Sequence, residues 1–225
     1  PRQSSQSPAD TSRRLLEHLD TALAGGDVRL IQTLLATDEE VEGILLREGG
    51  FKHTSNLLYL SCPSRDFSPT PPKTALHFVP YDRSDRKRLI RIVDATYVGT
   101  LDCPELNGIR DTEDVLSGYE GAGSRDSIRW FFVRHEDADV GCLLLTDHAQ
   151  QNVQELVYMG VAAGARGHGW GQLIARHAQW LTHQLGRERL VVAVDAANAP
   201  AIHAYAAVGF EAWDRRAVYL RVRGS

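Results

Sequence analysis

The spacing of apolar residues in the first quarter of the chain predicts a helix, a strand, a second helix and a second strand. Over residues 13–23 the leucines recur at three- and four-residue intervals, which is the period of a helix. Residues 28–35 are rich in side chains that favour strands, and Thr37 and Glu40 have the spacing of a capping box for the next helix. Residues 57–60 then form an apolar run that predicts the second strand.

The same order of elements returns near the end of the chain. Helical spacing over residues 172–185 is followed by a strand pattern at 190–194, a helix at 198–208 and a strand at 217–222. We therefore interpret residues 13–62 as a degenerate, partial αβαβ repeat of this C-terminal half. Chance similarity stays open as the alternative, because alternation of helices and strands is common.

Polar and proline-rich stretches divide the chain into parts. Residues 1–12 are polar, and we expect them to form a disordered tail. Four prolines within residues 63–73 predict a stiff linker rather than a regular element. The expected organisation is thus a tail, the partial repeat at 13–62, the linker, and a larger domain over residues 74–225.

The first half of the larger domain is predicted to hold a strand, two helices and three antiparallel strands. Ser84 is placed to cap the first helix, and Asp111 stands at the start of the second, with acids in its first turn. A polar turn joins two of the strands into a hairpin. The four predicted strands are residues 75–79, 128–135, 140–146 and 153–161.

The composition is that of a globular protein without a general affinity for polyanions. Apolar residues make up 43% and charged residues 24% of the chain, and 25 basic against 29 acidic side chains give a net charge of -4. No global field attracts nucleic acid or an anionic membrane, so a phosphate site has to be local. No apolar run approaches the roughly 18 residues that span a bilayer. We expect neither a nucleic acid nor a membrane as partner.

The cysteines favour a reducing compartment. Cys62, Cys103 and Cys142 are odd in number, far apart, and include no Cys-x-x-Cys pair, so we expect free thiols and no metal site. The polar start of the chain lacks the apolar core of a signal peptide. We therefore expect a cytoplasmic protein, with its oligomeric state, including a homodimer, left open.

A glycine-rich loop follows the last strand of the larger domain's first half. Gly167, Gly169 and Gly171 alternate between an apolar strand that ends at Val161 and a helix that is expected to begin at about Gln172. Alternate glycines let successive backbone N–H groups turn inward, and the helix start adds unpaired N–H groups and a positive dipole end. This arrangement predicts an anion site, most plausibly for a phosphate.

The spacing of this loop differs from the two common nucleotide motifs. Neither the Gly-Lys-Ser/Thr of a Walker loop nor the Gly-x-Gly-x-x-Gly of a dinucleotide fingerprint is present. Instead Arg166-Gly-His-Gly-Trp-Gly171 resembles the acetyl-coenzyme A loop of the GCN5-related N-acetyltransferase (GNAT) superfamily. Asn198, Tyr205 and the Gly-Phe after them are similar to a second family motif, and the order of elements over about residues 75–223 is also that of the family.

The resemblance implies a fold and a cosubstrate. The fold is of the α/β (α+β) class, with a mixed, mostly antiparallel central sheet flanked by helices, here preceded by the partial αβαβ repeat, and residues 74–225 are the catalytic domain. Acetyl-coenzyme A is the implied cosubstrate. The family's strand before the glycine loop bulges and parts from its neighbour, and Gly160 suits such a bulge. The implied cofactor-binding residues are Met159, Gly160, Val161, Arg166, Gly167, His168, Gly169, Trp170, Gly171 and Asn198.

The resemblance also implies a reaction, in which an amine attacks the acetyl thioester directly. Tyr205 is the implied acid that protonates the leaving thiolate, and Glu155 is the candidate base. An acidic loop with Asp102 and Glu105 is a candidate wall of an acceptor pocket for a small-molecule or peptide amine. The alternative is a regulatory or structural module that binds coenzyme A without turnover.

Overall fold

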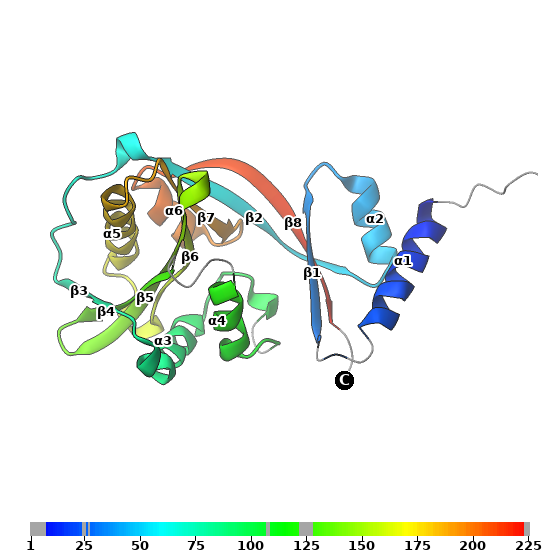
Figure 1. Cartoon of the computed structure of the whole chain (residues 1–225), viewed down its shortest axis with the longest axis horizontal. Helices are drawn as coiled ribbons and strands as arrows, with labels where there is room; N and C mark the ends of the chain where they lie inside the picture. The colour runs from blue at the N-terminus through cyan, green and yellow to red at the C-terminus, as the bar shows by residue number, and fades with distance from the viewer. Residues whose placement is uncertain (1–7, 24–25, 27, 107–108, 122–127, 223–225) are drawn as a thin grey trace, which may run out of the picture. The chain divides into compact units, whose positions relative to one another are not determined.

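The computed structural model describes residues 8–23, 26, 28–106, 109–121 and 128–222 (Figure 1). It divides into two compact units, one of residues 58–214 and one that combines residues up to 57 with those from 215 onward. The strands β2 (Lys52–Pro63) and β8 (Glu211–Val222) each contribute residues to both units.

In the larger unit the strands are hydrogen-bonded in the order β8-β2-β7-β6-β5-β4-β3. β6 runs parallel to β7, while β5 pairs with both β6 and β4 in antiparallel fashion and β4 pairs with β3 in the same way. The other strands of this unit are β3 (Leu76–Pro80), β4 (Ile128–His135), β5 (Ala138–His148), β6 (Val153–Val161) and β7 (Arg189–Asp195).

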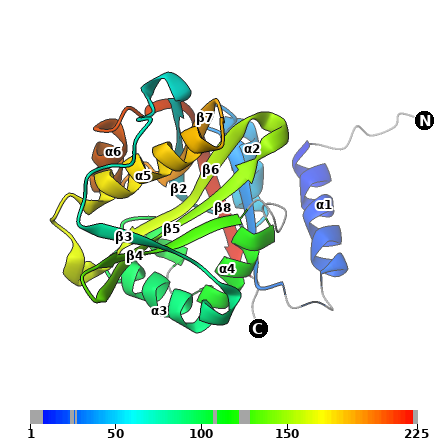
Figure 2. The same ribbon diagram turned by 60° about the vertical axis from the view of Figure 1, so that its left-hand side comes forward.

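Helices cover both faces of this sheet (Figure 2). On one face lie α5 (Trp170–Gln184) and α6 (Ala199–Ala206), and on the other α3 (Arg86–Tyr97) and α4 (Thr112–Gly121). β5 supplies both cores, because successive residues of a strand point to opposite faces. Leu143 and Leu145 join the cluster under α5, whereas Leu144 joins the cluster under α3.

The smaller unit consists of two helices against the strand order β1-β8-β2. In chain order these are α1 (Pro8–Ala22), β1 (Leu30–Ala36) and α2 (Glu40–Glu48), followed by the first part of β2. β1 pairs antiparallel with the last part of β8. Phe51, Ala217 and Tyr219 are buried at the centre of its core.

The expected architecture is confirmed: the eight strands form a mostly antiparallel sheet with flanking helices, and a helix, strand, helix, strand order opens the chain. No helix in the described part of the chain is long and apolar enough to cross a membrane. The first helix begins at Pro8, inside the expected tail, and residues 1–7 lie outside the described range. That residues 13–62 are a degenerate repeat stays a prediction.

Two expected helix caps are wrong. Glu39, not Thr37, is the N-cap of α2, and its carboxylate turns back to accept from the Ala36 N–H. Asp82 accepts from the Ser84 N–H in a short 3₁₀ turn, so the α3 helix starts only at Arg86. In both places the acid accepts from an N–H group that precedes the helix, so it closes the turn before the helix and not the helix itself.

Candidate active site

The candidate site lies where β6 and β7 diverge. The two strands pair only at Val153, Gln154 and Glu155, so β6 loses its neighbour from Leu156 onward. A cavity of about 460 Å³ occupies the gap, with residues 156–161 on one side and 192–194 on the other. Backbone groups of β6 that face away from β5 are therefore directed at the cavity instead of at another strand.

The β6 bulge is at Val157, not at Gly160 as expected. Leu144 of β5 opposes Tyr158 and Leu145 opposes Leu156, which leaves Val157 as the extra residue. Gly160 serves another purpose, since a Cβ atom there would stand 2.6 Å from the Cβ of Thr96 on α3. A side chain at position 160 would therefore force β6 away from α3.

The glycine loop presents a run of free amides. Gly167 and Gly169 adopt left-handed backbone conformations, with φ of +87° and +72°, which glycine reaches without a steric penalty. No backbone N–H from Gly167 to Gly171 donates a hydrogen bond to a described residue, whereas Gln172 already donates to the Gly169 carbonyl. The helix begins two residues earlier than expected, at Trp170. The loop and the first turn of α5 thus form an anion-binding concavity.

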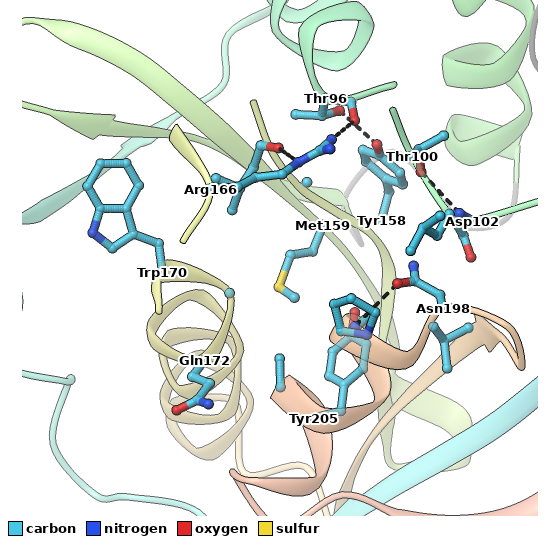
Figure 3. A pocket seen from close by; sticks show the side chains of 18 of the residues that line it. Thr96, Thr100, Asp102, Tyr158, Met159, Arg166, Trp170, Gln172, Asn198 and Tyr205 are labelled. Atoms are coloured by element: carbon cyan, nitrogen blue, oxygen red, sulfur yellow. Dashed lines mark hydrogen bonds between the residues drawn. The ribbon is translucent and has the colours of Figure 1, made fainter. Parts of the chain in front are cut away.

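Arg166 ties this loop to the end of α3 (Figure 3). Its guanidinium donates to the carbonyl oxygens of Thr96 at 2.8 Å, Gly99 at 3.1 Å and Val161 at 3.1 Å. The first two carbonyls belong to the C-terminal turn of α3 or follow it, where a cation also meets the negative end of the helix dipole. These three hydrogen bonds indicate that Arg166 fixes the loop.

Tyr205 and Asn198 reach the same cavity from α6. Tyr205 is 4% exposed, and its hydroxyl makes no hydrogen bond to a described residue. Burial raises the pKa of the Tyr205 hydroxyl above its usual value, and the charge of Asp102 raises it further. The Asn198 side chain caps α6 by accepting from the Ala201 N–H at 3.3 Å. Its amide NH₂ group remains for a ligand.

Three other residues that were expected to bind the cofactor, His168, Trp170 and Met159, differ in whether they reach the cavity. His168 is exposed and stacks on Trp170 at 4.9 Å between ring centroids, and His135 contacts the same indole at 4.9 Å. Trp170 lines the cavity, but His168 does not. Met159 projects its thioether into the space between the glycine loop and Tyr205 (Figure 3).

Glu155 does not line the cavity, although it belongs to β6, whose residues 156–161 do. Its carboxylate pairs with the ring of His148 at 2.9 Å. Of the two loop acids, Asp102 lines the cavity and Glu105 does not. The acid that lines the cavity is therefore Asp102, in the loop after α3, and not Glu155 on β6.

Thr96 and Tyr158 are site residues that the sequence did not reveal. Thr96 fits beneath Gly160, offers its carbonyl to Arg166, and shares a 2.7 Å hydrogen bond with the Tyr158 hydroxyl. Burial raises the pKa of Tyr158 well above the usual value of a phenol. No local motif marks these residues, because their partners are 60 or more positions away in the chain.

Comparison with known proteins agrees with this geometry. The family model described as Acetyltransferase (GNAT) family matches residues 86–210, more than half of the 225 residues. The chain belongs to the GNAT family. The resemblance carried by the glycine loop and by Asn198 and Tyr205 is thereby confirmed, as is the expected enzyme class at the level of the family.

Individual relatives of this GNAT chain are more distant. Streptothricin acetyltransferase from Streptomyces lavendulae is 34% identical over 95 residues, which are 41% of this chain and 50% of the relative. The chain thus spans about half the length of this curated relative.

Two solved structures share the fold. A GCN5-related N-acetyltransferase from Sphaerobacter thermophilus has a TM-score of 0.65 at 15% identity, covering 92% of this chain and 65% of that one. A second, from Kribbella flavida, also has a TM-score of 0.65 at 15% identity, covering 97% and 77%. At such identities the likeness shows the fold alone.

Proposed function

We propose that this GNAT protein transfers an acetyl group from acetyl-coenzyme A to a primary amine by direct attack. One observation carries the proposal. The cavity is continuous from the unpaired amides after Arg166, along the parted strand β6, to the hydroxyl of Tyr205. The anion site suits a pyrophosphate, and the row of open backbone groups suits an amide-bearing arm. The proton donor suits a thioester.

The amides from Gly167 to Gly171 are proposed to hold the pyrophosphate, helped by the positive end of α5. The backbone of Met159, Gly160 and Val161 would pair with the pantetheine amides in the manner of an added strand. One of these N–H groups, near the acetyl carbonyl, would stabilise the developing oxyanion. Asn198 would hold the arm from the opposite side through its free NH₂ group.

Tyr205 is proposed as the acid that protonates the departing thiolate. Its hydroxyl is un-ionised at neutral pH, as an ordinary phenol is, and burial raises its pKa further. It has no competing partner among the described residues. Glu155 could remove the amine proton only through a relay, since it is paired with His148 and stands outside the cavity.

The acceptor is proposed to be a small-molecule or peptide amine. The streptothricin acetyltransferase relative is named for a small molecule, which supports the first of these classes. The competing proposal, a module that binds coenzyme A without turnover, shares the loop but needs no proton donor at the far end of the cavity. Tyr205 lines the cavity, and its hydroxyl makes no hydrogen bond to a described residue, which favours the enzyme.

The test combines binding with turnover. Coenzyme A should raise the Tm, and thiol release from acetyl-coenzyme A should respond to primary amines. Tyr205→Phe should lower kcat by about 100-fold with coenzyme A affinity retained, which is the scale of a lost general acid. Tyr81→Phe removes a hydroxyl on the α3 side of the sheet and should leave kcat unchanged.

Three results would count against the proposal in different ways. The lack of any Tm shift with coenzyme A would remove its basis. Binding without thiol release across a broad amine panel would favour the module. Full activity in Tyr205→Phe would remove only the acid role of that residue.

A further inference from the structure

Asp102 is fixed at the cavity by a reciprocal pair of hydrogen bonds. Its Oδ1 accepts from the backbone N–H of Asp195 at 3.0 Å, while Oδ2 of Asp195 accepts from the backbone N–H of Cys103 at 3.0 Å. Cys103 takes a left-handed backbone conformation, with φ of +43°, where the chain turns to make this contact. The loop after α3 is thereby anchored to the end of β7, and the Asp102 carboxylate has a defined position.

Neither carboxylate of this pair forms an ion pair with a cation in the described part of the chain. Elsewhere in the larger unit, acids with similar exposure pair with arginine, as Asp139 does with Arg88 and Asp147 with Arg187. Over the described residues no ion pair involves Asp102 or Asp195, and Oδ2 of Asp102 accepts no hydrogen bond. Burial raises the pKa of the Asp102 carboxyl, the hydrogen bond from the Asp195 N–H lowers it, and the charge of Asp195 raises it, with a net upward shift.

A second polar group faces the same cavity. Tyr205 is a largely buried residue whose hydroxyl makes no hydrogen bond to a described residue, and the charge of Asp102 acts on this hydroxyl. Asp102 and Tyr205 line this cavity together with Asn198 and Thr100, and all four are labelled in Figure 3. A carboxylate that forms no ion pair and a hydroxyl that forms no hydrogen bond, both among the described residues, define a place for a ligand with a positive charge and a reacting centre.

We propose that Asp102 selects a cationic amine as acceptor and removes its proton. The inference rests on the proposed acetyl transfer. Oδ2 of Asp102 binds the substrate ammonium, R–NH₃⁺, and accepts one proton to give R–NH₂. The nitrogen lone pair then forms the N–C bond to the acetyl carbonyl, and the C–S bond breaks with its electron pair on sulfur.

The protons balance in this scheme. Tyr205 protonates the thiolate, and the second proton of the attacking nitrogen restores the Tyr205 hydroxyl. Asp102 returns its proton to solvent, so the net reaction converts R–NH₃⁺ and acetyl-S-CoA to R–NH-acetyl, CoA-SH and one proton. Asp102 thus takes the role that Glu155 could fill only through a relay.

The experiment compares Asp102→Asn on two amines of similar size. The amide Oδ1 of asparagine still accepts from the Asp195 N–H, so the loop anchor is kept while the charge is lost. The probes are propylamine, a cation at neutral pH, and 2,2,2-trifluoroethylamine, which is largely uncharged there. We expect kcat/KM to fall about 100-fold for propylamine and no more than about threefold for the fluorinated amine.

The controls separate this inference from the proposed function. Asp137→Asn removes the same charge from the exposed β4–β5 turn and should leave both rates unchanged. Equal losses on both amines in Asp102→Asn would show that Asp102 only anchors the loop, and no loss would show that it has no role. Either result overturns the inference while the enzyme proposal stands. A wild-type protein that binds coenzyme A but releases no thiol with any amine overturns both.

Discussion

At the scale of single residues, Gly160 and Thr96 set how closely β6 and α3 approach. The three nearest atoms to a Cβ at position 160 all belong to Thr96, at 2.6 to 2.8 Å, so neither the strand nor the helix can accommodate a methyl group without moving. Thr96 is itself held by its hydrogen bond to Tyr158. The width of the cavity on this side therefore depends on a residue that has no side chain.

We predict that Gly160→Ala destabilises the protein by about 1–3 kcal/mol, the usual cost of overpacking. Denaturant unfolding measures the change. Gly164→Ala is the matched control, since no atom lies within 4 Å of its added methyl group, and it should change stability by no more than about 0.5 kcal/mol. Equal stabilities for the two variants would contradict the contact between Gly160 and Thr96.

The site residues that could be predicted from the sequence are those that belong to a motif with a fixed local spacing. Asn198 and Tyr205 stand seven positions apart on one short helix, so their shared approach to the cavity follows from the sequence. Asp102 was only one of several loop acids, and its contact with Asp195 joins positions 93 apart. Residues brought together at that separation carry no local signal, which is why Thr96 was missed as well.

At the scale of elements, Arg166 connects three segments by a single side chain. Strand β6, the glycine loop and the C-terminal turn of α3 are joined through its donations to Val161, Gly99 and Thr96. The space beside two of the loop glycines is open, because an added Cβ at Gly167 or Gly169 would meet no atom within 4 Å. The loop needs this tie to keep its amides pointed at a ligand.

We predict that Arg166→Gln weakens coenzyme A binding about tenfold, or roughly 1.4 kcal/mol, by loosening the loop before the ligand orders it. Calorimetric titration with coenzyme A measures this loss. Arg176→Gln removes an exposed arginine on α5 whose only contact among the described residues is a 3.5 Å hydrogen bond, and it should bind normally. Unchanged affinity in Arg166→Gln would mean that the loop is preformed without its arginine.

The helices and strands could be predicted from the spacing of apolar residues, but their ends and the β-bulge could not. Every strand and helix expected in the larger unit is present, because a period of two or 3.6 depends only on which face is buried. The caps at Thr37 and Ser84 failed because α2 and α3 begin only at Glu40 and Arg86, after short turns in which Glu39 and Asp82 accept hydrogen bonds. The Val157 bulge depends on the register against β5, which the sequence of β6 alone does not contain.

At the scale of the whole molecule, the division into units depends on a contact between the two ends of the chain. The last part of β8 pairs with β1, about 190 positions earlier, and belongs to the same compact unit. The proline-rich stretch suggested a boundary, but β2 continues to Pro63 and the units divide before it. Composition marks where a chain is stiff, whereas strand pairing decides which parts fold together.

The larger unit should lose stability in mild acid because of His177. This ring stacks on Phe78 at 3.5 Å and is 9% exposed, and burial lowers the pKa of its imidazole from 6.5 to about 4. The unfolded chain therefore binds a proton more readily, so His177 contributes stability above pH 6.5 that is lost as the pH falls toward 4. The shift corresponds to about 3 kcal/mol.

Other groups titrate outside this window or with the opposite sign. Arginine partners hold the pKa values of Asp139 and Asp147 below 3.8, so their contribution is lost only at lower pH. The raised pKa of Asp102 acts in the other direction, since its protonation in the folded state adds stability as the pH falls. It offsets part of the loss due to His177.

We predict that His177→Phe flattens the dependence of the unfolding free energy on pH between 7 and 4, because phenylalanine keeps the stack on Phe78 and cannot titrate. Tryptophan fluorescence reports on the right part of the molecule, since all four tryptophans lie within residues 58–214. His183→Gln, at an exposed position near the end of the same helix, should retain the wild-type slope. A slope in His177→Phe as steep as that of the wild type would assign the acid sensitivity to groups other than this buried ring.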